Sequence, residues 1–449
     1  MNVSSKSRIR SYLFLTILLL TVALPAASGP AAAATDHQAL LKTTLANGLT
    51  ILINPNVDNE VVEFQAFVKM GQAYEGPSNY GVSALLQRVI TRGSADATAQ
   101  QIDNRLESYG AFLNTDVGPE YGELTLKCTG EVFAKCLPVV GEILLHPALP
   151  AAEVEKERQM LVREIAGSGD QPDQIVNDNF LKSFYGGGSY GIPARELGRS
   201  VAAIGRDGLL AWYQRVYTAR NMVISVVGRV DAADLAKKLK TIFQKMPSGE
   251  ALPLNAVRLP AGDENRVSYE VKETQALFMM LGYPAPDMFS PDWPAMTVLN
   301  WILGGGGMSS RLFAELREQK SLAYDVDSGY RKMMGPSYIA AFMATAPPNY
   351  EAARDGLLAA FQKLTVEKVS DTELANAKRA VRGRFVMAHE TNAGRAGIAG
   401  RYELFGLGHG FEAQYPLLID QISAADIQRV AQTYFRYYTL SVVSPKEIK

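Results

Sequence analysis

Metal binding and proton transfer in proteins depend most often on histidine, and this sequence contains four: His37, His146, His389 and His409. No two of them are three, four or five residues apart, so no pair shares one face of a helix as zinc ligands would. A long-range site built from His389, His409 and Glu390 is an alternative. We therefore expect no catalytic metal in this chain. A hydrolase with a relocated serine site would also need one of the four histidines.

Cys128 and Cys136 are the two cysteines, and their chemistry depends on the compartment. An oxidising compartment permits a disulfide, but an expected strand end followed by a helix need not bring the two Cα atoms within bonding range. A disulfide and a buried pair of free thiols both stay open as interpretations.

The N-terminus has the layout of a secretory signal peptide. Lys6, Arg8 and Arg10 precede an apolar run at 12–24, which is too short for a membrane span and leads into an alanine-rich stretch. We expect a cleaved signal at 1–34, a periplasmic or secreted protein, and no stable membrane insertion. The 45 basic and 46 acidic residues nearly balance, so the sequence gives no indication of a nucleic-acid partner.

The expected elements repeat one order along the chain, which indicates a duplicated α+β fold. Strands expected at 49–54 and 61–70 open the first stretch, and strands at 267–271 and 276–281 open the second. Three prolines and two glycines interrupt every periodic pattern between Pro247 and Asn265. The expected domains are an N-terminal domain at 38–246, a linker at 247–265 and a C-terminal domain at 266–449.

Several segments in order resemble the insulinase/pitrilysin family of zinc peptidases. They include Leu-Ala-Asn-Gly-Leu at 45–49, Lys-Met-Gly-Gln-Ala-Tyr-Glu-Gly at 69–76, Tyr-Gly-Ile-Pro at 190–193, and Gly-Gly-Gly-Met-Ser-Ser-Arg-Leu-Phe at 305–313. The resemblance covers nearly all of the chain after the signal peptide. It implies two homologous α/β-roll domains, each a mixed sheet with packed helices, which together form one half of a peptidase clamshell.

The family's zinc motif, His-x-x-Glu-His, is absent from the helix that should carry it. Ala84 and Arg88 stand at the histidine positions, and Gln87 stands at the position of the glutamate. Alanine has no donor atom, arginine remains cationic, and glutamine cannot act as a general base. Glu157 and Glu164 are retained on the later helix, with Glu164 at the position of the third metal ligand.

The retained acid suggests a new role for Arg88. A salt bridge between Arg88 and Glu164 would fill the vacant site with a charge pair. The alternative is that Glu164 is an ordinary solvated helix residue. In either case the resemblance implies no cofactor in this chain and places the zinc in a partner subunit.

The resemblance also implies a retained part of the chemistry. In this family the C-terminal domain supplies an arginine and a tyrosine seven residues apart, which reach toward the peptide at the zinc. Arg317 and Tyr324 keep that spacing. A guanidinium and a phenol can stabilise the oxyanion of a tetrahedral intermediate or hold the substrate backbone. Without the resemblance, Arg317 reads as a helix-end residue and Tyr324 as a packing residue of a strand.

Two further segments bear on peptide handling. In the family an exposed strand edge accepts the peptide as an extra strand, and the corresponding residues here are Phe112, Leu113 and Asn114. An ordinary sheet strand is the alternative. The glycines at 304–307 lack the ending of a phosphate-binding loop, and we expect a flexible turn between two helices.

The leading hypothesis is a non-zinc subunit that pairs with a homologous zinc-bearing chain and supplies Arg317 and Tyr324 during peptide hydrolysis. Alone, this chain is expected to be inactive. The alternative hypothesis is a catalytically inactive scaffold that binds peptides or assembles with other proteins, in which those two side chains have no role.

Overall fold

The computed structural model describes residues 40–447, apart from 256, 258, 261 and 262. The signal peptide predicted at 1–34 lies outside these residues. The described residues belong to one compact unit. None of its described helices is long and apolar enough to cross a membrane.

Six strands of the first half form a mixed sheet in the order β1-β2-β6-β3-β5-β4. They are β1 (Leu41–Thr44), β2 (Thr50–Pro55), β3 (Val61–Val68), β4 (Phe112–Val117), β5 (Gly122–Thr129) and β6 (Met222–Gly228). β2 and β6 run parallel, and the other neighbours run antiparallel. β6 is buried along its whole length, as the apolar residues on both sides of Ser225 favour. β4 has β5 as its neighbour on one side and forms an edge.

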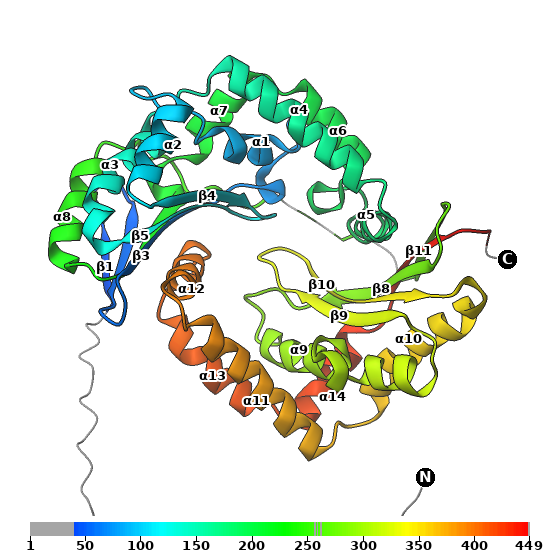
Figure 1. Cartoon of the computed structure of the whole chain (residues 1–449). Coiled ribbons are helices and arrows are strands. Elements are labelled where there is room, and N and C mark those ends of the chain that lie inside the picture. The colour runs from blue at the N-terminus through cyan, green and yellow to red at the C-terminus, as the bar shows by residue number, and fades with distance from the viewer. Residues whose placement is uncertain (1–39, 256, 258, 261–262, 448–449) are drawn as a thin grey trace, which may run out of the picture. The chain divides into compact units, whose positions relative to one another are not determined.

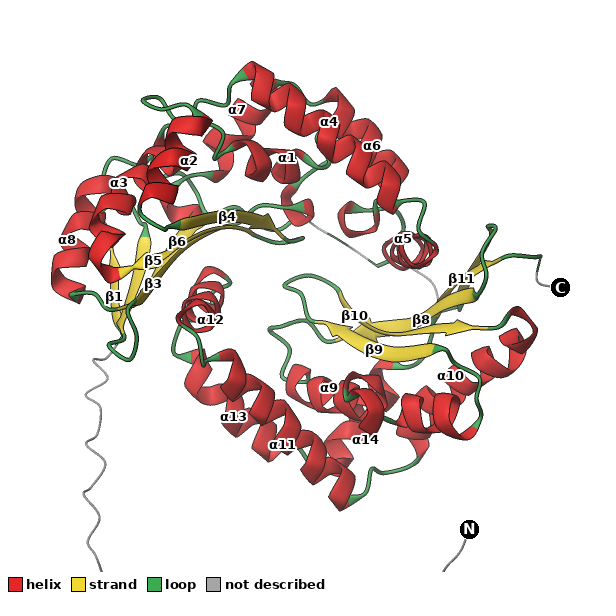
Figure 2. Cartoon of the chain, viewed as in Figure 1, coloured by secondary structure: helices red, strands yellow, loops and turns green. Residues whose placement is uncertain are grey.

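Helices of the first half gather on one side of this sheet (Figure 2). They are α1 (Val82–Val89), α2 (Ala99–Ser108), α3 (Gly130–Leu145), α4 (Ala151–Ser168), α6 (Ala194–Ala203), α7 (Arg206–Val216) and α8 (Ala232–Phe243). Their apolar stripes bury residues such as Leu85, Phe133 and Leu239 against the strands. α1 packs between β4, α4 and α7, which fixes the helix that carries the altered motif.

Five strands of the second half form another mixed sheet in the order β7-β11-β8-β10-β9 (Figure 1). They are β7 (Arg266–Val271), β8 (Leu277–Ala285), β9 (Asp325–Arg331), β10 (Ser337–Thr345) and β11 (Thr439–Ser444). Its helices are α9 (Trp293–Asn300), α10 (Tyr350–Val366), α11 (Asp371–Ala388), α13 (Phe411–Gln421) and α14 (Ala424–Tyr434). β7 and β9 are the two edges, so the segment after Tyr324 is an edge strand.

One helix from each half packs on the sheet of the other half. α5 (Pro172–Tyr185) contacts β7, β8 and β11, and its Phe180 and Phe184 contact the ring of Tyr338. α12 (Asn392–Leu404) contacts β3 and β6. A Cβ at Gly400 would lie 2.3 Å from the Phe67 ring, so glycine permits this close approach. Each sheet therefore has helices packed on both faces, and each half completes the core of the other.

The structure confirms the predicted α+β class with two mixed sheets. The residue pattern predicted no element where β1, α6 and α13 lie. Between α8 and β7, where the linker was predicted, the described residues form no helix or strand. Cys128 and Cys136 are both buried free thiols in this structure.

The prediction of a flexible glycine turn at 304–307 was largely wrong. α9 continues directly into a π-helical segment, η4 (Trp301–Gly305), so Gly304 and Gly305 remain helical. A Cβ at Gly304 would lie 2.4 Å from the backbone nitrogen of Ser328 on β9. Close packing therefore requires this glycine. Gly307 has a positive φ of 60° and begins the short 3₁₀ helix η5 (Gly307–Ser309).

Candidate functional site

The helix that should carry the zinc motif begins at a glycine turn, and a buried carboxylate holds this turn by hydrogen bonds. Gly81 precedes α1 with a φ of 84°, a conformation that favours glycine. Glu75 accepts hydrogen bonds from the backbone nitrogens of Gly81, at 2.7 Å, and of Ser83, at 2.9 Å. Burial raises the pKa of the Glu75 carboxyl above its ordinary value, and these hydrogen bonds partly counter that rise.

Gln87 stands at the position of the catalytic glutamate and is fully engaged in structural hydrogen bonds. Its side chain is buried, and Nε2 donates to the backbone oxygens of Asp116, at 3.0 Å, and Glu123, at 3.2 Å. Tyr217 donates its hydroxyl to Oε1 of Gln87 at 2.8 Å. An ionised glutamate could make none of the first two bonds, because it has no hydrogen to donate. Gln87 thus ties α1 to β4 and β5.

Arg88, at the second histidine position, forms the ion pair that the sequence predicted. Its Nη1 and Nη2 lie 2.8 and 2.9 Å from the two carboxylate oxygens of Glu164, a two-point contact. Its Nε donates to Glu157 at 3.1 Å. Hydrogen bonding to Glu164 and Glu157 raises the pKa of Arg88 above its ordinary value, against the opposing effect of burial. The structure confirms the Arg88–Glu164 salt bridge.

A second arginine, which sequence reasoning missed, completes this cluster. Arg92 lies four residues after Arg88, just beyond the end of α1, and its Nε is 3.1 Å from the other carboxylate oxygen of Glu157. The Glu157 side chain is only 3% exposed and is held between the two arginines. The four-residue spacing of the arginines was the available signal for this contact. Ala84, the first histidine position, is half-buried and offers no ligand atom.

His389 and His409 are each engaged in a local contact. His389 Nε2 lies 3.1 Å from Glu412, and His409 Nδ1 lies 3.2 Å from Glu403. No group of three or more His, Cys, Asp or Glu side chains that could hold a metal ion occurs among the described residues. The alternative site with Glu390 is therefore not assembled in this part of the chain.

Residues 187–191 fit the spacing Gly-x-Ser-x-Gly of a hydrolase elbow, but their structural context is different. An elbow places its serine on a sharp turn from a strand to a helix. Here Ser189 opens a short 3₁₀ helix, η2 (Ser189–Gly191), that follows α5. The hydroxyl of the next residue, Tyr190, donates to Glu120 at 2.7 Å. The segment acts as a packed turn.

Arg317 and Tyr324 lie on the segment that leads into β9, and their side-chain polar groups make no hydrogen bond to the described residues. Arg317 lies in the π-helical segment η6 (Phe313–Gln319) with its guanidinium 5.1 Å from the centre of the Phe313 ring. The backbone nitrogen of Tyr324 donates to Ala344 at 2.8 Å, while its side chain is 62% exposed. Among the described residues, neither side chain has a hydrogen-bond or ion-pair partner. Buried Leu316 fixes the adjoining turn.

The predicted peptide-binding strand lies at a sheet edge. Phe112, Leu113 and Asn114 begin β4, the outer strand beyond β5. The Phe112 side chain is 72% exposed, and Asn114 is exposed as well. An edge strand has backbone groups free to pair with another chain. This position is compatible with peptide addition, which stays a prediction.

Two family models together account for most of the chain. Residues 50–196 match the model described as insulinase, peptidase family M16, and residues 203–381 match the model described as the peptidase M16 inactive domain. The chain belongs to the insulinase/pitrilysin family. The resemblance drawn from the segments at 69–76, 190–193 and 305–313 is thereby confirmed.

Relatives of this M16 chain align along most of their length. A protein of Rickettsia bellii named uncharacterized zinc protease is 27% identical over 406 residues, which cover 90% of this chain and 97% of that protein. A protein of the same description from Bacillus subtilis is 25% identical with the same coverage. The names of these relatives mention zinc. This chain has Ala84, Gln87 and Arg88 in place of the zinc motif, so we do not extend that part of the name to it.

Solved structures share the fold. The peptidase M16 inactive domain from Pseudomonas fluorescens superposes with a TM-score of 0.84 at 20% identity, covering 92% of this chain and 99% of that one. A protease from Helicobacter pylori gives a TM-score of 0.82 at 22% identity, covering 91% of this chain and all of that one. Both likenesses concern the fold alone.

Proposed function

We propose that this chain is the non-zinc subunit of a heterodimeric M16 metallopeptidase and that it supplies Arg317 and Tyr324 to the active site of a zinc-bearing partner. One contrast carries the proposal. The two polar positions of the altered motif, Gln87 and Arg88, are tied up in structural contacts. The side chains of Arg317 and Tyr324 have no hydrogen-bond or ion-pair partner among the described residues, and Tyr324 is exposed.

The proposed chemistry divides between the two chains. Zinc in the partner would polarise the scissile carbonyl and activate a water molecule. When the carbonyl carbon becomes tetrahedral, its oxygen gains negative charge. The guanidinium of Arg317 and the phenol of Tyr324 can both donate hydrogen bonds, so they are suited to that oxygen or to the neighbouring backbone carbonyls. Neither group transfers a proton in this scheme.

The proposal extends to the compartment and to peptide binding. An exported protein would meet its partner and its substrates in the periplasm or outside the cell. The peptide would lie against the free edge of β4, where backbone pairing is independent of sequence. Exposed Phe112 offers apolar contact at the start of this strand.

Reconstitution from separate chains tests the proposal. The partner candidate is an exported homologue with an intact His-x-x-Glu-His helix. We expect each chain alone to cleave an unfolded peptide poorly, and an equimolar mixture to cleave it in a chelator-sensitive manner. Full activity of the zinc-bearing chain without this one would refute the proposal.

The scaffold alternative predicts a different outcome of the same experiment. The chains could form a complex, or this chain could bind peptides, without any dependence of turnover on Arg317 or Tyr324. Complex formation should be measured by gel filtration in parallel with turnover. A complex whose turnover does not depend on Arg317 or Tyr324 favours the scaffold alternative.

A further inference from the structure

Strand β7 is an edge of the second sheet. It pairs with β11 on one side, and its residues read Arg-Val-Ser-Tyr-Glu-Val. Natural edge strands are often protected by proline, charged side chains or a bulge, but the charged residues of β7, Arg266 and Glu270, both lie on the face opposite Val267, Tyr269 and Val271. Val267, Tyr269 and Val271 are 45%, 54% and 56% exposed. β7 therefore combines a free edge with an apolar face in contact with solvent.

The backbone of β7 has donors directed away from the sheet. The nitrogens of Arg266 and Lys272 donate to Tyr438 and Ser444 in or beside β11. In a strand, alternate residues face the same neighbour, so the amides of Val267, Tyr269 and Val271 point to the free side. These amides are positioned to pair with an added strand.

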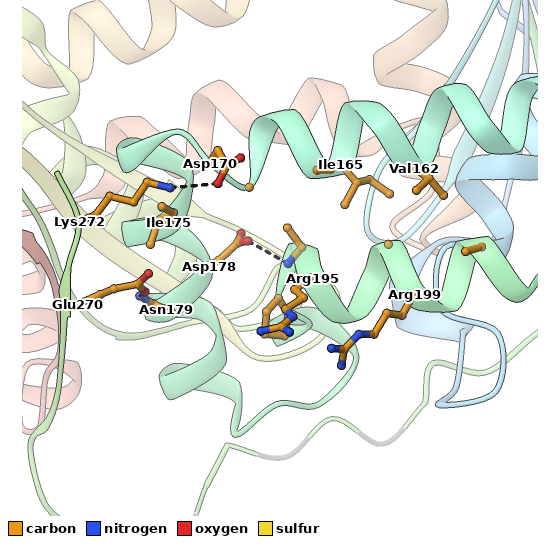
Figure 3. A pocket seen from close by; sticks show the side chains of 16 residues that line it. Val162, Ile165, Asp170, Ile175, Asp178, Asn179, Arg195, Arg199, Glu270 and Lys272 are labelled. Atoms are coloured by element: carbon orange, nitrogen blue, oxygen red, sulfur yellow. Dashed lines mark hydrogen bonds and ion pairs between the residues drawn. The ribbon is translucent and has the colours of Figure 1, made fainter. Parts of the chain in front are cut away.

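Two adjoining hollows lie along β7 and α5. The larger has a volume of about 810 Å³ and is formed by α4, α5, α6 and the end of β7 (Figure 3). The other, of about 610 Å³, follows β7 toward Arg266. Asn179 and Glu270 line both and are joined by a hydrogen bond of 2.7 Å. We call this surface the β7 groove; a strand edge beside a helix is a known way to receive an extended peptide.

Acidic groups in the larger hollow already have partners. Asp170 lies 3.0 Å from Lys272, and Asp178 accepts a hydrogen bond from the backbone nitrogen of Ala194. Figure 3 shows both contacts as dashed lines. Glu270 is bonded to Asn179. Only Asp170 is paired with a cation, but across both hollows five basic side chains outnumber the three acidic ones: Lys182, Arg195, Arg199, Arg266 and Lys272.

Two basic groups in the same hollow, Arg195 and Arg199, have no acidic partner among the described residues. Arg195 and Arg199 project from the same side of α6, one turn apart (Figure 3). The floor beside them is apolar, with Val162, Ile165 and Ile175. The β7 groove therefore complements a chain that bears both apolar and acidic side chains.

We propose that the β7 groove binds an extended acidic segment of a partner protein, which adds to the second sheet as an outer strand beside β7. Its alternate side chains lie on the Val267–Val271 face and toward the guanidinium groups of Arg195 and Arg199. The bound segment is not the peptide that is cleaved. Tyr324, which is proposed to contact the cleaved peptide, directly precedes β9. β7 and β9 are opposite edges of a five-stranded sheet, about 19 Å apart at ordinary strand spacing. This inference does not depend on the proposed role of Arg317.

A labelled peptide of alternating valine and glutamate, with blocked ends, is the probe. Fluorescence anisotropy with the full chain should show saturable binding that weakens as salt is raised, and a valine–lysine peptide of equal length should not bind. Val271→Pro removes one donor from the free edge and leaves the amides that face β11 intact. We expect it, and separately Arg195→Glu with Arg199→Glu, to weaken binding about tenfold or more.

Matched controls separate the groove from general effects. Val271→Thr retains the edge amide, and Arg105→Glu reverses one exposed arginine on distant α2; both should bind the probe within about twofold of wild type. Circular dichroism melting identifies any variant that fails to fold, and Arg199→Gln then replaces the double reversal.

Three results would overturn the inference. The first is absence of probe binding to the wild-type chain up to about 1 mM. The second is binding that neither Val271→Pro nor the arginine reversal changes. The third is competition between the probe and a cleaved peptide in the reconstituted peptidase, which would assign the groove to the substrate instead of a partner protein.

Discussion

At the scale of single residues, the positions of the zinc motif have acquired structural roles. Gln87 uses its amide group to join α1 to two strands, and Arg88 joins α1 to α4 through Glu157 and Glu164. A buried carboxylate between two arginines is costly to disturb, since removing one partner leaves a buried charge. The site is therefore a packed junction in which the former ligand positions hold elements together.

Gln87→Glu should destabilise the protein, although it restores the residue type of the catalytic base. The carboxylate would face the oxygens of Asp116 and Glu123 without a hydrogen to donate, at a cost of about 2–4 kcal/mol in unfolding free energy. Urea denaturation near neutral pH measures this.

The pH dependence of Gln87→Glu follows from the same contact. The folded state should raise the pKa of the new carboxyl. The loss of unfolding free energy relative to wild type should therefore grow as pH rises above the pKa that this carboxyl has in the unfolded chain. Gln87→Met, which adds no charge, should show no such trend. Equal stability of Gln87→Glu and wild type across pH would contradict the hydrogen-bond assignment.

How much of this site the sequence predicts depends on distance along the chain. Ala84, Gln87 and Arg88 were located through the family resemblance. The salt bridge between Arg88 and Glu164 was predicted because both residues stand at positions of metal ligands. Tyr217, which donates to Gln87, is 130 residues away and gave no pattern that could link the two. Hydrogen bonds of this kind arise from tertiary packing that local periodicity does not describe.

At the scale of elements, β3 contains a carboxyl group whose ionised form is disfavoured by its surroundings. Glu63 lies opposite Lys127 on β5, 3.9 Å away, and one of its oxygens has no hydrogen-bond partner. Burial raises the pKa of Glu63 to about 7; Lys127 partly opposes the rise and Glu123 adds to it. A folded pKa above the unfolded value means that the folded state retains a proton that the unfolded chain releases.

Stability should therefore fall as pH rises from about 4.5 to about 7, as far as Glu63 determines it. Glu63→Gln removes this dependence and should raise the unfolding free energy at pH 8 by about 1 kcal/mol, allowing for solvent screening. Denaturant midpoints of both proteins at pH 5 and pH 8 provide the comparison. A deficit of Glu63→Gln at pH 8 larger than at pH 5 would show that the ionised carboxylate is stabilising.

Elements with one clear period were predicted well, and those with conflicting signals were not. The strand predicted at 267–271 is β7, which begins only one residue earlier, at Arg266. α6 was missed because Gly198 interrupts its pattern and Pro193 precedes it, as in a loop. The glycine run at 304–307 suggested mobility, whereas Gly304 is required by contact with Ser328. A glycine in the sequence does not distinguish freedom from close packing.

At the scale of the whole molecule, the exchange of α5 and α12 makes the two halves interdependent. The domain boundary near 247–265 was predicted from a break in pattern, which carries no information about packing between halves. A fragment of residues 38–246 would expose the face of β3 and β6 that α12 covers and would leave α5 without its sheet. Such exposed apolar surface favours aggregation.

We expect the 38–246 fragment alone to be aggregated or loosely packed, and to become soluble when coexpressed with 266–449. The near-ultraviolet circular dichroism spectrum and gel filtration distinguish these states. A monomeric 38–246 fragment with cooperative unfolding would show that the exchange of helices contributes little to folding.

The central claim is that catalysis is divided between two chains, and the turnover of Arg317→Ala in the reconstituted peptidase tests it most directly. With the zinc-bearing partner in place, kcat should fall about 10²–10³-fold, because one oxyanion donor is lost, while gel filtration shows an intact complex. Tyr324→Phe should lower kcat as well, and Arg105→Ala, which alters an exposed arginine on α2, should leave it unchanged. An Arg317→Ala complex with the kcat of wild type would contradict the account.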